Sequence, residues 1–108
     1  MEERRERLCR LLDCYGEALS ERCRDVMTSY YADDLSLAEI AENCGITRQG
    51  VHDALRRGES ELTAWENALG LLKKREKLFA LIDRLSGSQY AGERALAVEL
   101  AEILADDR

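Results

Sequence analysis

Side chains suited to nucleic-acid contact gather in one short stretch of the sequence, residues 47–57. In a major groove, arginine pairs with guanine and glutamine with adenine, while arginines and hydroxyls also hold phosphates. Aspartate repels phosphate, so the aspartate here must face a base or another side chain. The stretch predicts DNA contact; the alternative is solvated charges on a helix that packs or binds protein. The predicted contact residues are Thr47, Arg48, Gln49, His52, Asp53, Arg56 and Arg57.

The same side chains do not form a catalytic pattern. His52 is the single histidine, and Asp53 beside it on a helix points about 100° away. Ser36 and Thr47 are expected to cap helices rather than act as nucleophiles. Phosphate-binding glycine loops, nucleophile elbows and zinc-protease motifs do not occur in the sequence. We therefore expect no catalytic residues, no enzyme activity and no cofactor.

The cysteines indicate neither a metal site nor a redox motif. No two of them have the C-x-x-C spacing of zinc or thioredoxin-like sites. Each falls on or beside an apolar helix stripe, so we expect small, largely buried side chains in a reducing compartment. A disulfide framework or a metal site is the weaker alternative. These residues are Cys9, Cys14, Cys23 and Cys44.

A helix-turn-helix at residues 36–57 is expected to position the polar stretch. Ser36 and Glu39 have the spacing of a capping box, Gly45 supplies a left-handed turn residue, and Thr47 caps the next helix. Ala41 must be small because the second helix crosses close to it. The apolar residues that fill the wedge between the two helices are Ile40, Ile46, Val51 and Leu55.

The rest of the chain also predicts helices. It has no proline and few stretches rich in Val, Ile or Thr, so we expect an all-α bundle rather than a sheet. Apolar spacing and caps place helices near residues 3–15, 21–31, 37–44 and 89–105, with a long helical tract from residue 48. Gly58 and Gly70 bend or break this tract, and residues 86–88 form a loop.

A length of 108 residues fits one domain. Within it we expect an N-terminal bundle over 1–57 and C-terminal helices over 58–108 that form a homodimer. The C-terminal helices carry more apolar surface than the final helix alone can cover, which favours a dimer. The alternative is that the final helix folds back and covers this surface within one chain. The residues expected at the dimer interface are Leu62, Trp65, Leu69 and Leu72.

The net charge and the hydropathy of the sequence limit the classes of partner that the protein can bind. The net charge of −6 argues against strong nonspecific binding to polyanions. The longest apolar run, residues 78–82, is far below the roughly 20 residues of a membrane span, so no membrane insertion is expected. A basic patch is expected to contact phosphate or an acidic partner, or else to be a solvated helix face. It consists of Lys73, Lys74, Arg75 and Lys77.

Residues 33–42 and 46–57 together carry a family resemblance. The segments DDLSLAEIAE and ITRQGVHDALRR resemble the YlxM family of small bacterial helix-turn-helix proteins. The similarity spans about residues 8–72, and the family's helix-turn-helix is similar to the fourth region of bacterial sigma factors. The resemblance implies a cytoplasmic, non-enzymatic protein that dimerises through its C-terminal helices and acts in the signal recognition particle pathway.

Two classes of function follow. The first is a regulatory protein that binds DNA through the helix-turn-helix. The second is a protein-interaction module that modulates the signal recognition particle GTPase without reading DNA, with the particle's protein or RNA as partner. Duplex RNA does not suit a recognition helix, because its deep, narrow major groove does not admit one.

Overall fold

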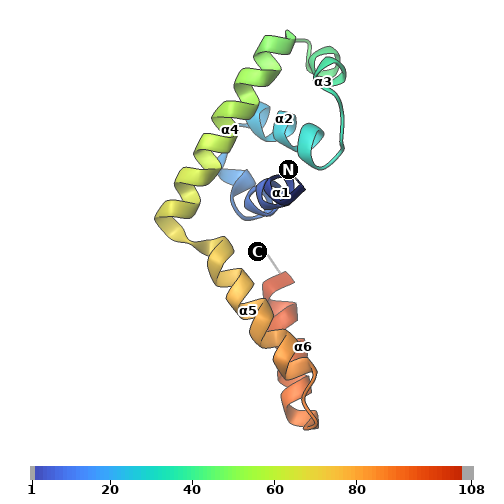
Figure 1. The fold of residues 1–108 in the computed structure, drawn as a ribbon, viewed down its shortest axis with the longest axis vertical. Coiled ribbons are helices and arrows are strands. Elements are labelled where there is room, and N and C mark those ends of the chain that lie inside the picture. The colour runs from blue at the N-terminus through green and yellow to red at the C-terminus, as the bar shows by residue number, and fades with distance from the viewer. Residues whose placement is uncertain (1, 106–108) are drawn as a thin grey trace. The chain divides into compact units, whose positions relative to one another are not determined.

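The computed structural model describes residues 2–105, and within them all regular secondary structure is helical (Figure 1). This confirms the predicted all-α class. The last helix begins two residues later than its apolar pattern suggested, because Ser88 and Tyr90 are used in its cap. The elements are α1 (Glu2–Tyr15), the short 3-10 helix η1 (Gly16–Ala18), α2 (Glu21–Tyr31), α3 (Leu37–Cys44), α4 (Arg48–Leu69), α5 (Leu71–Ser86) and α6 (Ala91–Ala105).

The chain divides into two compact units, Met1–Gly70 and Leu71–Arg108. The division follows Gly70, whereas the sequence analysis placed it after residue 57. The reason is that α4 continues unbroken past Gly58 and ends only where Gly70 adopts a left-handed backbone with φ of 64°. Among the described helices, none is long and apolar enough to cross a membrane.

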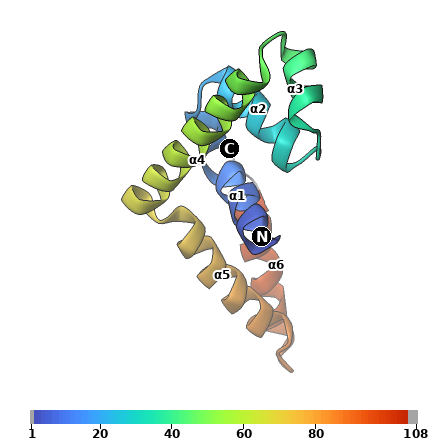
Figure 2. The same cartoon turned by 45° about the horizontal axis from the view of Figure 1, so that its top comes forward.

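In the first unit, α1, α2 and α3 lie along one side of the long helix α4 (Figures 1 and 2). Each helix contributes apolar side chains to a shared core between them. Fully burying one such side chain contributes roughly 1.5–3 kcal/mol. The fully buried side chains of this core are Leu11, Cys23, Val26, Met27, Ile40, Val51 and Leu62.

At Gly58, α4 approaches α2 closely. A Cβ atom at this position would lie 2.7 Å from the Met27 sulfur and 3.0 Å from the Cys23 sulfur. Met27 is fully buried and has little room to move away. The glycine is therefore not a helix break but the residue that lets the two helices pack at this distance.

A polar network on α1 fixes the chain before α3. The Arg5 guanidinium donates to the Tyr30 carbonyl at 2.6 Å and to the Asp34 carboxylate at 2.5 Å. The same group lies over the rings of Tyr30 and Tyr31, 5.4 Å and 5.7 Å from their centres. Asp34 has a left-handed backbone, with φ of 60°. The network thus holds the connection from α2 to α3, and with it the start of the helix-turn-helix.

A second network ties α1 and α2 to the middle of α4. The buried Tyr31 hydroxyl donates to the Glu59 carboxylate, which also pairs with Arg4 at 3.0 Å. Burial, together with this hydrogen bond, raises the pKa of Tyr31 well above its usual value. The Tyr15 hydroxyl donates to Glu66 at 2.6 Å, about two turns further along α4.

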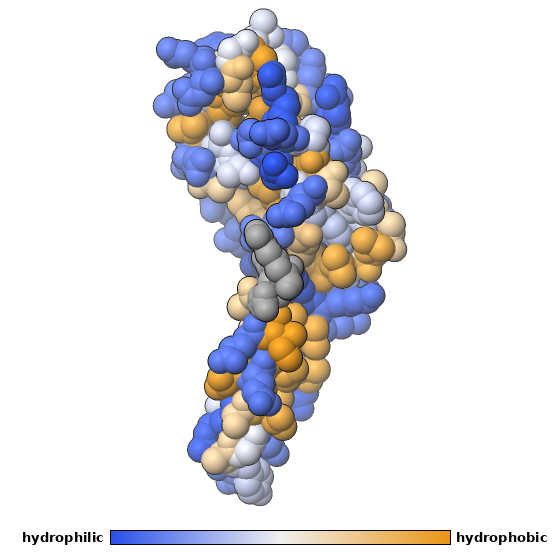
Figure 3. All heavy atoms as spheres, turned by 180° about the vertical axis from the view of Figure 1, so that it is seen from behind, coloured by the Kyte–Doolittle hydropathy of each residue, from blue (hydrophilic) through white to orange (hydrophobic). Residues whose placement is uncertain are grey.

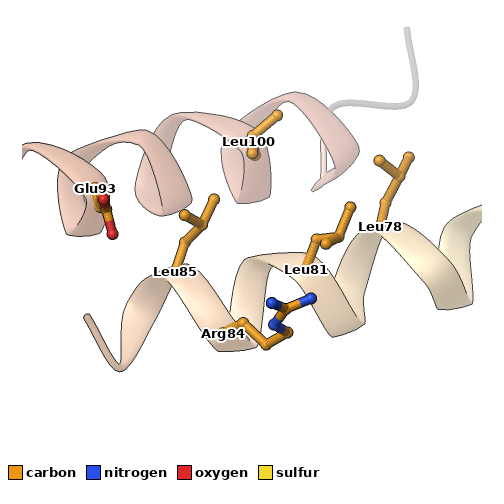
Figure 4. A pocket seen from close by; sticks show the side chains of 6 residues that line it. All are labelled: Leu78, Leu81, Arg84, Leu85, Glu93 and Leu100. Carbon is orange, nitrogen blue, oxygen red and sulfur yellow. The ribbon is translucent and has the colours of Figure 1, made fainter.

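The second unit is a hairpin of α5 and α6, which pack against each other (Figure 1). Ser88 lies just before α6 and binds its first turn. Its hydroxyl accepts from the Tyr90 amide at 3.0 Å and donates to Glu93 at 2.6 Å. Leucines of α5 point toward Leu100 of α6 across an open cavity (Figure 4). The side chains lining this cavity are Leu78, Leu81, Arg84, Leu85, Glu93 and Leu100.

Candidate nucleic-acid interface

The first helix of the motif begins at a reciprocal cap. The Ser36 hydroxyl accepts from the Glu39 amide at 3.1 Å, and the Glu39 carboxylate accepts from the Ser36 amide at 3.0 Å. Hydrogen bonding of this carboxylate to Ser36, to its backbone amide first and then to its side chain, lowers the pKa of Glu39. The predicted capping box is confirmed, and it sets the first residue of α3.

The turn between the helices also follows from local chemistry. Gly45 has φ of 67°, a left-handed conformation that glycine adopts without steric cost. The amide of Ile46 then donates to the Ala41 carbonyl at 3.0 Å, which closes the end of α3. Ala41 and Ile40 are buried. The helix-turn-helix predicted at 36–57 is therefore present, with α3 and the start of α4 as its two helices.

Thr47 caps the second helix of the motif. Its hydroxyl accepts from the Gly50 amide at 3.0 Å and so fixes where α4 starts. One face of α4 packs into the core through Val51, Ala54 and Leu55. The opposite face is exposed, and it carries all the residues predicted to contact nucleic acid: Thr47, Arg48, Gln49, His52, Asp53, Arg56 and Arg57.

This exposed face is locally basic in a chain whose net charge is −6. It carries three arginines, Arg48, Arg56 and Arg57, and one carboxylate, that of Asp53. That carboxylate accepts from the side-chain amide of Gln49, with 3.0 Å between Nε2 and Oδ1. This bond was not among the predictions from the sequence, although the spacing of four residues on a helix was the signal for it.

The structure does not bring the predicted basic patch into the unit that carries the recognition helix. Lys73, Lys74, Arg75 and Lys77 lie in the first half of α5, in the second unit. Lys73, Lys74 and Lys77 are exposed and Arg75 is partly exposed.

The residues expected at a dimer interface differ in accessibility. Leu62 is fully buried in the core of the first unit, and Leu72 is also buried. Leu62 has no exposed surface for a partner to contact in this conformation. Trp65 and Leu69 are 41% and 47% exposed. Trp65 also stacks on Tyr15, with 6.5 Å between ring centres.

No disulfide joins the cysteines among the described residues. Cys23 is buried and its thiol donates to the Ala54 carbonyl at 3.3 Å, while Cys9 donates to the Tyr31 carbonyl at 3.3 Å. Burial raises the pKa of the Cys23 thiol. Residues 2–105 bring together no group of three or more side chains suited to a metal ion.

Comparison with known sequences decides the family. The sequence model of the UPF0122 family, described as "Putative helix-turn-helix protein, YlxM / p13 like", matches residues 2–102. The chain belongs to this family. The match covers the helix-turn-helix, all of α5 and most of α6.

Individual UPF0122 proteins agree with this assignment. The chain is 38% identical over 102 residues to a UPF0122 protein of Symbiobacterium thermophilum, covering 90% of this chain and 95% of the relative. It is 39% identical over 106 residues to one of Geobacillus kaustophilus, with 95% and 96% covered. A relative from Clostridium botulinum is 47% identical over 74 residues, with 68% and 67% covered.

Proposed function

We propose that this UPF0122 protein is a non-enzymatic regulatory protein that binds duplex DNA through the first three turns of α4. The observation that carries the proposal is the division of α4 into two faces. One face packs Val51, Ala54 and Leu55 against the core, and the other presents arginines, a glutamine and a histidine to solvent. A recognition helix held in this way is the arrangement that helix-turn-helix proteins insert into a major groove.

The roles of the exposed residues follow from their chemistry. Arg48 and Gln49 lie in the first turn, which enters a groove most deeply, so they read base edges. Arg56 and Arg57 lie two turns later and hold phosphates. Thr47 offers the amino end of the helix to a phosphate, and His52 lies beside the base-reading residues.

The proposal is tested by selecting binding sites from randomised duplex DNA and measuring affinity at several salt concentrations. Arg48→Ala and Gln49→Ala should relax the sequence preference. Arg57→Ala should weaken binding to all sequences alike and reduce the slope of log affinity against log salt by about 1. Arg7→Ala is the matched control, because it removes an exposed helical arginine from α1. If no genomic DNA binds near 50 mM salt, the proposal fails.

A second candidate function is a protein-interaction module that modulates the signal recognition particle GTPase. It is favoured by the acidic net charge of −6 and by apolar side chains exposed on the second unit. Purified protein should then form a complex with that GTPase that survives nuclease treatment. Arg48→Ala and Gln49→Ala should leave such a complex intact, which separates this function from DNA binding. Both functions place the protein in the cytoplasm.

We also propose that the protein is a homodimer, with Trp65, Leu69 and the second unit at the interface. Large apolar side chains are exposed on both helices of the hairpin, as the orange surface over α5 and α6 illustrates (Figure 3). The two helices carry opposite charge: α5 has five basic and two acidic residues, and α6 has three acidic and one basic. A two-fold partner would set α5 of one copy against α6 of the other and cover both apolar faces.

A further inference from the structure

Asp53 is the unexplained residue of the proposed DNA-binding face. It is exposed on the same side of α4 as Arg48, Gln49 and Arg56. A carboxylate there repels the phosphates that the arginines attract. A face built only for affinity would not carry it. Its hydrogen bond to Gln49 indicates what it does instead.

The bond fixes which atoms Gln49 can present. An ionised carboxylate only accepts hydrogen bonds, so the Gln49 group that faces it must be the NH₂. The carbonyl oxygen of the amide is then turned away from Asp53, and one N–H of the NH₂ remains for another partner. Gln49 therefore offers an acceptor and a donor side by side, without having to choose between two flipped orientations.

We propose that Asp53 is a positioning residue that holds Gln49 in the orientation that reads adenine. This inference rests on the proposed function and deepens it. Adenine presents an N6 donor and an N7 acceptor in the major groove, and a fixed glutamine amide matches both. Because its carboxylate repels phosphates, Asp53 lowers the affinity for DNA of any sequence while it raises the preference for adenine.

Substitutions at Asp53 separate its hydrogen bond from its charge. Asp53→Ala removes both. Asp53→Asn removes the charge but keeps a carbonyl oxygen that can accept from Gln49. Asp25→Ala is the control, because Asp25 is also an exposed helical aspartate of the first unit. Since these positions are exposed, all three variants are expected to fold, and circular dichroism checks this.

The experiment starts from a duplex site selected by the unaltered protein. Affinities are then measured for that site, for every single-base variant of it and for random duplex. Gln49→Ala identifies the base pair that Gln49 reads, as the position where the adenine preference disappears. At that position Asp53→Ala should lower the preference by at least about fivefold, the lower end of what a bidentate contact contributes.

The other variants also have definite expected affinities. Asp53→Asn should keep the adenine preference, both Asp53 variants should bind random duplex more tightly, and Asp25→Ala should change neither property. If Asp53→Ala keeps the full preference, or Asp53→Asn loses as much of it as Asp53→Ala, the positioning role is overturned while DNA binding stands. If no site can be selected, the proposed function fails and this inference fails with it.

Discussion

The two units of the chain treat their apolar residues in opposite ways. The first unit buries residues from all four of its α-helices. Among its described large apolar side chains, it leaves only Trp65 and Leu69 exposed. The described part of the second unit buries Leu72, Ile82 and Ala97. Its exposed large apolar side chains are Leu71, Leu78, Phe79, Leu81, Tyr90, Leu96, Val98 and Ile103.

The difference reflects geometry rather than composition. Three helices against α4 enclose a core, whereas two helices share a single line of contact and cannot cover the other sides of one another. Large exposed apolar patches in soluble proteins mark interaction surfaces. The first unit therefore encloses its own core, and the second unit leaves the apolar surface that the proposed dimer would cover.

The largest expected effect is on association. Leu81→Asp and Leu69→Asp place a charge in the proposed dimer interface, where leaving it unpaired and buried is costly. Light scattering at micromolar concentration should show a dimer for the unaltered protein and folded monomers for these variants. Glu99→Lys tests the charge pairing less severely and should weaken the dimer. A mass near 12 kDa for the unaltered protein over the whole concentration range would end the dimer proposal.

The next effect tests whether the two faces of α4 differ in packing. Leu62→Ala removes a fully buried side chain and should lower the free energy of unfolding by about 2–5 kcal/mol. Leu69→Ala, in the same helix but 47% exposed, should cost much less. Urea denaturation of both variants measures the difference. Equal losses would mean that the interior and the surface of α4 are not as described.

The close contact of α2 and α4 gives a third test. Gly58→Ala adds a methyl group 2.7 Å from the Met27 sulfur, and overpacking of this kind costs about 1–3 kcal/mol. Helix propensity alone predicts a gain of up to about 1 kcal/mol, so the two explanations differ in sign. Gly92→Ala is the control, because its added methyl meets nothing within 4 Å. A stabilised Gly58→Ala variant would show that the helices are not in close contact there.

The smallest effect comes from the Tyr31 hydroxyl. Because its pKa is raised in the folded protein, Tyr31 contributes stability that is present below the usual tyrosine pKa of about 10 and is lost as the pH rises above it. Tyr31→Phe should cost about 0.5–1.5 kcal/mol at pH 7. Its thermal midpoint should also fall less than that of the unaltered protein on going from about pH 9 to 11.

Cys23 provides the internal control for that comparison. Burial is the main cause of the raised pKa of the Cys23 thiol, so its ionisation at high pH also lowers the stability of the folded protein. This loss is the same in the unaltered protein and in the Tyr31→Phe variant. The difference between their pH profiles therefore belongs to Tyr31. Identical profiles would mean that the hydroxyl is not held by Glu59 in solution.

The sequence by itself determined the features that depend on neighbours within a few residues. Ser36 and Glu39 satisfy each other's amides, Gly45 adopts a backbone that other residues avoid, and Thr47 caps α4. These contacts span three or four positions, so residue types and spacing suffice to predict them. The exposed face of α4 followed in the same way, because helical periodicity separates it from Val51, Ala54 and Leu55.

Only the tertiary structure decided what required a distant partner. Gly58 looked like a break until Met27 and Cys23, more than 30 residues earlier, were found against it. Leu62 fitted a dimer stripe by spacing alone, but it has no exposed surface in the folded chain. The Tyr31–Glu59 bond is equally invisible in the sequence. Helical spacing shows which residues share a face, but what covers that face depends on how distant segments of the chain pack.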